Sequence, residues 1–470
     1  MEGCRGRTHS TSLHPFIPIS PLRVAVSRAA ADLLRELFSA AVAGAMPDAA
    51  TADAVRELSP GATAGGVRVL AAGKAARAMA VAAVRALAER GVEPAGGIVV
   101  AAEAGGAPHP ALPLVVGDHP IPGARSLAAA ADLQRAVARV RPRELVLVLL
   151  SGGATSLVAG AAFVAPPPDL RTLFEMLLAS GADIATMNAV RKRFLRWGAG
   201  RLARALAERR ANVHCLVVSD VLGDDLTTIA SGPCVPDPLL ADDLIALLEG
   251  LRLWRGVPES FRLHLLAVAR GQLPETPKPG DRAFARVSTR IIVSNRHALR
   301  AAAARARELG VRAVPIEDRP MRGEASACGV EIARRLAGDA AGPGPFPTCR
   351  LWGGETTVTL GDAGAAPGAL GGRCQELALA AARVLHDAGP EPARVTLLAA
   401  GTDGRDGPTD AAGAIVDAGT WDAIRAAGRD PARDLAAHDS YRALDAAGAL
   451  LRTGPTGTNV MDVAIGLVSA

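Results

Sequence analysis

The residues best suited to chemistry lie in short loops that follow apolar runs of the chain. These loops combine glycine with charged or hydroxyl side chains and comprise Gly73-Lys74, Ser151 to Ser156, Ser219-Asp220, Ser294-Asn295, Gly353 to Thr356, and Gly401 to Asp403. Ligands of open α/β sheets bind at the carboxyl ends of the strands. If each apolar run is a strand, these loops predict one shared site for a polar ligand.

Lys74 stands in the stretch AAGKAA, where a strand is expected to turn into a helix. A cation at a helix N-terminus is unfavourable for the helix dipole, but the lysine and the free backbone N–H groups together suit a bound anion. The stretch is not a P-loop, because Ala75 replaces the Ser or Thr that would hold magnesium. A solvent-exposed lysine without a ligand is the simpler alternative. We predict that Lys74 is catalytic.

The stretch LLSGGATSLV places Gly152 and Gly153 directly after an apolar run. Backbone amides without side chains nearby can approach phosphate oxygens closely, and Ser151, Thr155 and Ser156 add hydroxyl donors. A tight turn with a helix N-cap also explains a hydroxyl at this position. Because several such loops are expected to converge, we predict that all five residues bind phosphate or substrate.

Carboxylates follow two further apolar runs. Asp220 ends one of them, and VTLLAAGTDGRDGPTDAAGA carries Asp403, Asp406 and Asp410. The spacing does not match a calcium-binding loop. Aspartate also forms turns through its own backbone hydrogen bonds, which is the alternative for Asp403 and Asp406. We predict that Asp220, Asp403 and Asp406 hold Mg²⁺ through water, and that Asp220 and Asp403 are catalytic. The sequence leaves open which aspartate is the general base.

Arg373 lies beside two glycines just before an expected helix, in GGRCQELALA. An arginine is always charged and can clamp a carboxylate or phosphate with two parallel hydrogen bonds. We therefore predict a catalytic role, with an ordinary surface arginine as the alternative. The remaining residues of the loops that we predict to bind substrate or phosphate are Asp118, His119, Asn295, Gly353, Gly354 and Glu355.

The elements that must position these loops alternate between apolar runs and Ala-rich amphipathic stretches. Such alternation is typical of a parallel sheet covered by helices on both faces, and 470 residues exceed the usual size of one core. We predict an α/β protein with two domains. The predicted division is a disordered tail over 1–23, a Rossmann-like domain over 24–272, a connecting region over 273–345 and a second α/β domain over 346–470.

The composition and the charge pattern argue against several classes of protein. The net charge of +5 is spread along the chain, and no basic run is interleaved with aromatic residues, so nucleic-acid binding is not expected. The cysteines lie far apart and form no CxxC pair, so neither a thiolate metal site nor a disulfide framework is expected. No stretch is apolar enough for a membrane span or a signal peptide, and we expect a cytoplasmic protein. The sequence leaves the oligomeric state open and allows a homodimer.

Ten stretches in register resemble the class II glycerate kinases, the glycerate 2-kinases with a C-terminal MOFRL domain. Among them are AAGKAA, GDHPIPG, LLSGGATSLV, ETPKPGD, GGRCQELALA and TGPTGTNVMDV, and the similarity runs from about residue 28 to the C-terminus. The resemblance implies two α/β domains with the active site in the cleft between them. It further implies ATP and Mg²⁺ as co-substrate and cofactor, and conversion of D-glycerate to 2-phosphoglycerate. It also implies that Lys74 and Arg373 are the essential cations of the family.

Two residues depart from the family pattern. Cys374 stands where Asn is usual, and Arg193 stands where His is common, whereas the neighbouring Lys192 is kept and is expected to bind substrate. Two alternatives to the kinase remain at this stage. One is a nicotinamide-dependent hydroxypyruvate reductase, which lacks support because no GxGxxG fingerprint follows a strand here. The other is a non-catalytic protein that binds sugar acids.

Overall fold

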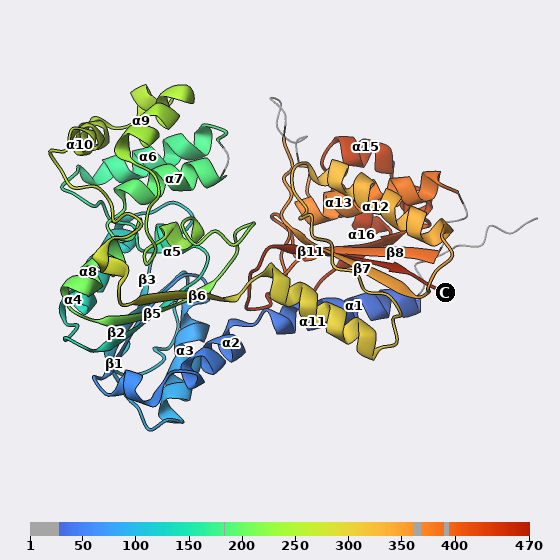
Figure 1. The fold of residues 1–470 in the computed structure, drawn as a ribbon. Helices are drawn as coiled ribbons and strands as arrows, with labels where there is room; N and C mark the ends of the chain where they lie inside the picture. Colours follow the sequence, from blue (N-terminus) through green and yellow to red (C-terminus); the bar gives the residue numbers. More distant parts are fainter. Residues whose placement is uncertain (1–27, 183, 361–367, 390–393) are drawn as a thin grey trace, which may run out of the picture.

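The computed structural model describes residues 28–182, 184–360, 368–389 and 394–470. It contains two sheets, one of six strands and one of five, with helices on both faces of each (Figure 1). The predicted disordered tail over 1–23 lies outside the described residues. Within the described ranges, no helix has the length and apolar character needed to span a membrane.

The first sheet is parallel throughout and has the order β3-β2-β1-β4-β5-β6. Its strands are β1 (Val67–Ala72), β2 (Pro94–Ala101), β3 (Leu114–Val116), β4 (Leu145–Leu150), β5 (Asn212–Val218) and β6 (Val287–Val293). The central strands β1 and β4 are buried at every residue, and β4 is accordingly apolar throughout. The one charged residue of β1, Arg68, pairs with the buried Glu144 at 3.2 Å. The predicted Rossmann-like parallel sheet is confirmed.

Helices cover this sheet on both faces. One face packs against α2 (Pro47–Arg56) and α3 (Ala76–Ala88), and the other against α4 (Ala124–Ala138) and α8 (Arg201–Glu208). The short helix α5 (Ala154–Leu157) begins directly after the loop that follows β4. Single 3-10 turns occur at η1 (Pro60–Thr63), η2 (Ile229–Ser231), η3 (Trp254–Gly256) and η4 (Arg282–Phe284).

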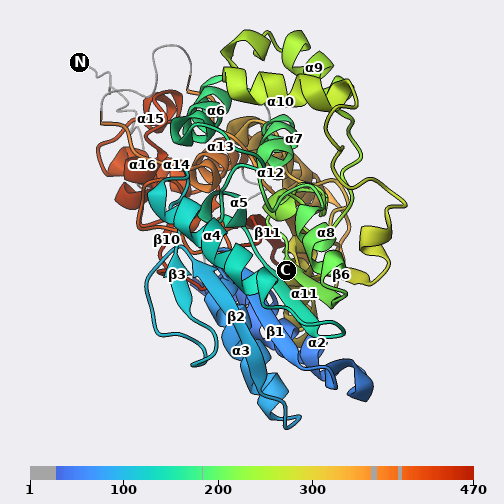
Figure 2. The same ribbon diagram turned by 90° about the vertical axis from the view of Figure 1, so that its left-hand side faces the viewer.

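A separate helical lobe lies above the carboxyl ends of the first sheet (Figures 1 and 2). It consists of α6 (Pro167–Ala179), α7 (Ile184–Phe194), α9 (Ala241–Gly250) and α10 (Glu259–Ala269). Its own core contains Phe174, Phe194 and Phe261, which are fully buried. The helical lobe therefore lies over the loops that follow the strands of the first sheet.

A histidine in this lobe makes its stability depend on pH. The His264 ring stacks on Phe163 with the ring centroids 3.9 Å apart, and burial, with Arg201 and Arg193 nearby, lowers its pKa to about 4. As the pH falls from about 6.5 to about 4, the unfolded chain binds a proton that the folded chain does not, so the free energy of unfolding falls. We expect His264→Phe, which keeps the stack, to reduce the loss of Tm between pH 7 and pH 4.5. An unchanged pH dependence would contradict this account.

The second sheet has the order β10-β9-β8-β11-β7, and every neighbouring pair in it is antiparallel. Its strands are β7 (Thr348–Gly354), β8 (Val395–Gly401), β9 (Gly413–Asp417), β10 (Leu450–Leu451) and β11 (Asp462–Val468). The parallel arrangement that strand and helix alternation suggested does not extend to this sheet. Because β11 runs between β7 and β8 in the opposite direction, β7 and β8 still end at the same edge.

The second sheet is also covered on both faces. One face carries α12 (Ala325–Ala341), α13 (Arg373–Asp387), α14 (Thr420–Ala426), α15 (Pro431–Ala436) and α16 (Ser440–Ala446). The other carries α1 (Arg28–Gly44) and α11 (Asn295–Glu308), which pack on each other and on β11 (Figure 1). The domain predicted over 24–272 includes α1, yet this helix lies against the second sheet. The domain limits themselves stay a prediction.

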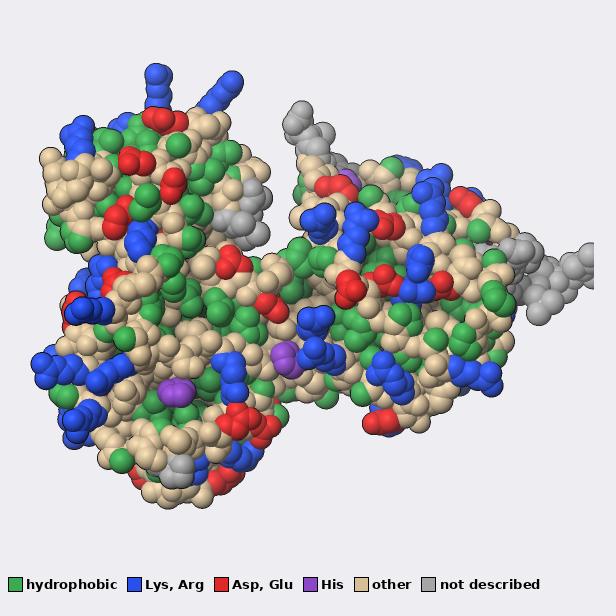
Figure 3. Space-filling model, viewed as in Figure 1, with side chains coloured by type: hydrophobic (Ala, Val, Ile, Leu, Met, Phe, Trp, Pro, Cys, Tyr) green, Lys and Arg blue, Asp and Glu red, His purple; other side chains and the backbone are tan. Residues whose placement is uncertain are grey.

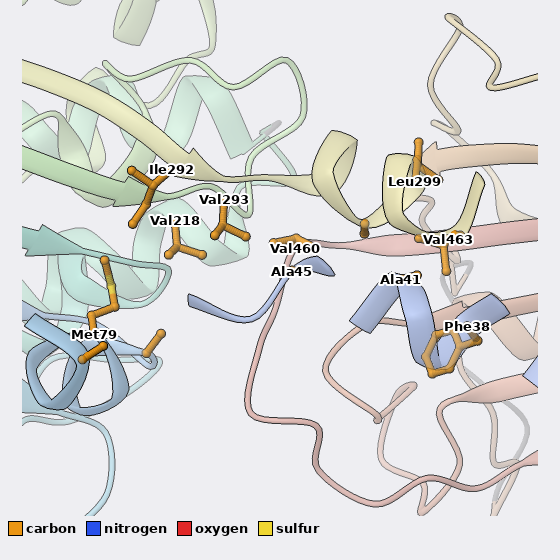
Figure 4. Close-up of a cluster of buried hydrophobic side chains, with 14 of the residues drawn as sticks. Phe38, Ala41, Ala45, Met79, Val218, Ile292, Val293, Leu299, Val460 and Val463 are labelled. Atoms are coloured by element: carbon orange, nitrogen blue, oxygen red, sulfur yellow. The ribbon is translucent and has the colours of Figure 1, made fainter. Parts of the chain in front are cut away.

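The chain crosses between the two sheets at two places that lie side by side. One crossing runs from α1 to α2 through Ala45, and the other from β6 to α11 after Val293. The Thr458 hydroxyl donates to the Ala45 carbonyl at 2.6 Å, and Val460 packs between the two crossings (Figure 4). One buried apolar cluster therefore runs through the junction and makes it the natural hinge between the domains.

Candidate active site

The loops after β1 and β4 are tied together by backbone contacts. The Lys74 N–H donates to the Gly152 carbonyl at 2.9 Å, and the Ala75 N–H donates to Ser151 Oγ at 2.9 Å. A Cβ on Gly73, whose φ is +129°, would lie 2.2 Å from Ser151 Oγ, so this approach requires glycine. The lysine itself is exposed and has no ion pair with any described residue. Its charge is therefore free to receive a ligand.

Asp220 lies directly behind the glycine loop. A Cβ on Gly152 would lie 1.7 Å from Asp220 Oδ2, so the carboxylate touches the loop backbone. Burial raises the pKa of Asp220, and the charge of Lys74 opposes that shift. The structure thus brings together Lys74, Gly152 and Asp220, which come from the ends of three neighbouring strands.

His119 joins this group, but Asp118 does not. A Cβ on Gly153 would lie 3.3 Å from His119 Nε2 and 3.4 Å from Lys74 Cγ. Burial and the Lys74 charge lower the pKa of His119, which keeps its imidazole neutral at physiological pH. Asp118 instead accepts the Arg125 N–H at 2.9 Å and pairs with the Arg125 guanidinium at the start of α4. Its role is therefore that of a helix cap.

The predicted hydroxyl donors are occupied in shaping the loop. Thr155 Oγ1 lies 2.9 Å from Ser231 Oγ, and Ser156 Oγ donates to the Gly153 carbonyl at 3.1 Å. The backbone amides of Gly152 and Gly153 are consequently the better candidates for anion contacts. Lys192 lies apart from this loop contact network, buried in an ion pair with Asp237 at 3.1 Å.

The Lys192 pair belongs to a larger buried network that explains one departure from the family pattern. Arg193 donates to Asp237 at 3.1 Å and to Thr276 at 2.7 Å, and it also pairs with Glu275. Lys278 pairs with Glu275 at 3.3 Å. Arg193 thus ties α7 to the proline-rich segment around 275–278. The predicted binding of substrate by Lys192 stays a prediction.

The second half of the site centres on Arg373, the first residue of α13. Its Nε and Nη2 donate to the two carboxylate oxygens of Asp462 at 2.6 and 2.9 Å, and its Nη1 pairs with Glu355 at 2.8 Å. Asp462 is almost fully buried, whereas the Arg373 side chain is 35% exposed. The guanidinium is therefore anchored on its inner side and open on its outer side.

Asn295 and the glycines of β7 support this arrangement. The Asn295 amide donates to the carbonyls of Val460 and Asp462 at 2.8 and 2.9 Å. A Cβ on Gly353 would lie 1.7 Å from Asn295 Oδ1, and a Cβ on Gly354 would lie 2.3 Å from a backbone oxygen. These residues were predicted to bind substrate, and their observed contacts are with the protein itself.

The three aspartates of the loop after β8 have three different environments. Asp406 is buried and accepts the N–H groups of Cys374 and Gln375 at 3.1 and 2.8 Å, so it caps α13, and burial raises its pKa to about 6. Asp410 pairs with Arg452 at the surface. Asp403 accepts the Arg405 N–H at 3.0 Å in a local turn. Both oxygens of Asp406 are used by the helix, which leaves Asp403 as the better metal candidate.

A hollow separates the upper parts of the two domains (Figure 3), and Asp220 of the first domain lies near enough to Glu355 of the second to shift its pKa. Burial raises the pKa of Glu355, Arg373 lowers it, and the charges of Asp462, Asp220 and Asp403 raise it further. Asp220 belongs to the first sheet and the others to the second, so acids from both domains act on one carboxylate. Over the described ranges, no cluster of three His, Cys, Asp or Glu forms a complete metal site.

The sequence did not single out Asp462 although it lies in a stretch that carries the family resemblance. Ligand-binding side chains of a parallel sheet lie at the carboxyl ends of its strands, whereas Asp462 begins a strand. It reaches the same edge because β11 is antiparallel to β7 and β8, with Asp462 paired to Gly354 and Gly401. Cys374, the second departure, is buried, and burial together with the neighbouring charges of Asp462 and Asp406 raises the pKa of its thiol.

The fold and the site define a two-domain α/β protein whose cleft presents cations and glycine amides to an anionic ligand. Two family models match the chain: a domain of unknown function, DUF4147, over 33–266, and the MOFRL family over 348–462. A glycerate 2-kinase of Pyrococcus horikoshii is 37% identical over 76% of this chain and 78% of its own length. A protein of Agrobacterium vitis, with the name of a hydroxypyruvate reductase, is 39% identical over 78% of this chain and 80% of its own.

A solved structure agrees with these matches. The crystal structure of a glycerate kinase from Thermotoga maritima superposes with a TM-score of 0.81 at 34% identity, covering 94% of this chain and all of that one. The chain belongs to the glycerate kinase family.

Proposed function

We propose that the protein transfers the γ-phosphoryl group of ATP to the 2-hydroxyl of D-glycerate, forming 2-phosphoglycerate and ADP. The observation that carries this proposal is the unpaired Lys74 at the glycine loop, which faces a cleft whose other wall presents Arg373. Phosphoryl transfer needs positioning and neutralisation of charge more than covalent chemistry. The glycerate 2-kinases among the relatives support the reaction, and the reductase name marks its rival.

The positions of the charged groups suggest which residue performs each part of the phosphoryl transfer. Lys74 and the amides of Gly152 and Gly153 bind the phosphates of ATP and stabilise charge on the transferring group. The open face of Arg373 receives the glycerate carboxylate, for which its fork geometry is suited. Asp220 accepts the proton of the attacking hydroxyl, because it lies at the glycine loop and its raised pKa makes it a stronger base.

The acids of the cleft fit a divalent cation. Asp220 and Asp403 both raise the pKa of Glu355, so three carboxylates repel one another across the cleft. Carboxylate oxygens are the ligands that Mg²⁺ prefers, and a cation there relieves this repulsion. Asp403 and Glu355 would hold the ion with water and phosphate oxygens, and the ion would supply further neutralisation of the triphosphate. Closure of the domains at the hinge excludes water and limits hydrolysis of ATP.

The test is incubation with ATP, Mg²⁺ and D-glycerate, followed by ³¹P NMR of the products. A 2-phosphoglycerate resonance that depends on both substrates supports the proposal. A 3-phosphoglycerate resonance refutes the choice of hydroxyl and keeps the kinase. Oxidation of NADH or NADPH by hydroxypyruvate, without phosphorylated product, would favour the reductase. Glycerate binding without either reaction would favour a non-catalytic protein.

A further inference from the structure

One tightly held charge beside Arg373 is a carboxylate that the proposed reaction does not use directly. The Asp462 side chain is 3% exposed, and both of its oxygens accept hydrogen bonds from Arg373. A bidentate pair of this kind fixes the plane of the guanidinium as well as its position. Without it, the long arginine side chain is free to adopt several rotamers, and ordering it on substrate binding costs conformational entropy.

Asp462 is itself held from three sides. Its backbone is paired in register with Gly354 on β7 and with Gly401 on β8, the two strands that deliver the glycine and acidic loops. Its carbonyl accepts the Asn295 amide at 2.9 Å, and the same amide also reaches Val460. Asn295 is the first residue of α11, directly after the chain leaves the first sheet. The position of Asp462 is thus linked to the hinge.

We propose that Asp462 is the positioning residue of Arg373, and that Asn295 fixes Asp462 relative to the hinge between the domains. This inference rests on the proposed kinase function and adds a residue to it. Asp462 lies behind the guanidinium and does not touch the substrate, so it acts only through Arg373. Asn295, in turn, supplies no contact to the substrate and holds the start of β11 where the two domains meet.

This arrangement predicts that substitutions of Asp462 and Arg373 have non-additive effects on kcat/KM. Asp462→Asn keeps the size of the side chain but removes its charge and leaves one oxygen to accept two donors. We expect it to lower kcat/KM for glycerate at least about 10-fold, because small errors in the placement of a catalytic group are costly. In an Arg373→Ala background the same substitution should change kcat/KM less than about twofold, since residues that act as a unit are not additive.

Rescue with guanidinium ion gives a readout that a purely structural role would not move. In Arg373→Ala the space between Asp462 and Glu355 can bind free guanidinium, so added guanidinium should restore part of the activity. In the double variant Arg373→Ala/Asp462→Asn it should restore none, because the anchoring carboxylate is gone. Equal rescue of both variants, or equal losses from Asp462→Asn in both backgrounds, would overturn the proposal.

The matched control is Asp417→Asn. Asp417 is also buried at a strand end of the second sheet, but it accepts only from Gly419 and Thr420 at the start of α14. The Asp417→Asn variant should have a lower Tm and an unchanged kcat/KM for glycerate. If Asp462→Asn does not fold, Asn295→Ala provides the same cycle with Arg373→Ala. A wild-type protein that forms no phosphoglycerate overturns the kinase and this inference together, whereas an active wild type with additive variants overturns only the inference.

Discussion

Lys74→Ala is expected to lower kcat/KM for phosphorylation of glycerate by about 10²- to 10³-fold while leaving Tm nearly unchanged. The side chain is exposed and makes no ion pair with the described residues, so its removal breaks no contact that stabilises the fold. Among the residues that the structure describes, Lys74 is nevertheless the cation that lies against both the glycine loop and Asp220. The loss is expected in kcat more than in KM for glycerate, because the charge acts on the transferring phosphoryl group.

Arg77→Ala is the matched control for this measurement. Arg77 lies in the first turn of α3, which follows the Lys74 loop, is exposed, and among the described residues donates to the Gly106 carbonyl at 3.1 Å. Its substitution removes one positive charge from the start of α3, away from the glycine loop. Steady-state kinetics of the two variants should differ by the full effect of Lys74. A Lys74→Ala enzyme that stays within about threefold of wild type would exclude Lys74 from the chemistry.

Gly152→Ala is expected to lower kcat about 100-fold and to destabilise the fold by about 1 to 3 kcal/mol. The φ angle of Gly152 lies outside the left-handed region, so an alanine is not strained by its backbone. Its Cβ, however, would lie 1.7 Å from Asp220 Oδ2. Either the carboxylate or the loop must move, and both belong to the proposed machinery.

The control for this substitution is Gly338→Ala. Gly338 lies within α12, and a Cβ there would meet no atom within 4 Å. It should raise Tm slightly, because alanine restricts the unfolded chain more than glycine does. Thermal unfolding and kcat measured on both variants separate a general cost of losing glycine from the contact with Asp220. Full activity in Gly152→Ala would show that Asp220 and the loop tolerate displacement and would refute their proposed roles.

Much of the fold could be predicted from the sequence because local patterns carry it. The apolar runs Val69 to Ala72 in β1 and Leu145 to Leu150 in β4 predicted strands buried on both faces, and the glycines and charged residues after each run marked the edge where ligands bind. Lys74, the glycine loop and Asp220 follow from that rule alone, since strands in one parallel sheet all end at the same edge.

Other features depend on contacts between segments far apart in the chain, which no local pattern records. The second sheet is antiparallel, and its strand order decides that Asp462, at the start of β11, meets Arg373 at the start of α13. Likewise, nothing near Asp406 or Lys192 in the sequence distinguishes a ligand-binding side chain from a helix cap or a buried ion pair. The hydrogen-bond or ion-pair partner of each side chain decides between these roles, and that partner lies elsewhere in the sequence.

The sequence by itself therefore determined the class of fold and the kinds of charge that reach the cleft. Types and spacing of residues fix secondary structure and burial because these depend on neighbours along the chain. Only the tertiary structure decided which charged side chains remain available to a ligand and which are paired with other residues of the protein. That choice depends on desolvation and on hydrogen-bond partners, and both are set only when the strands, helices and loops of each domain pack together.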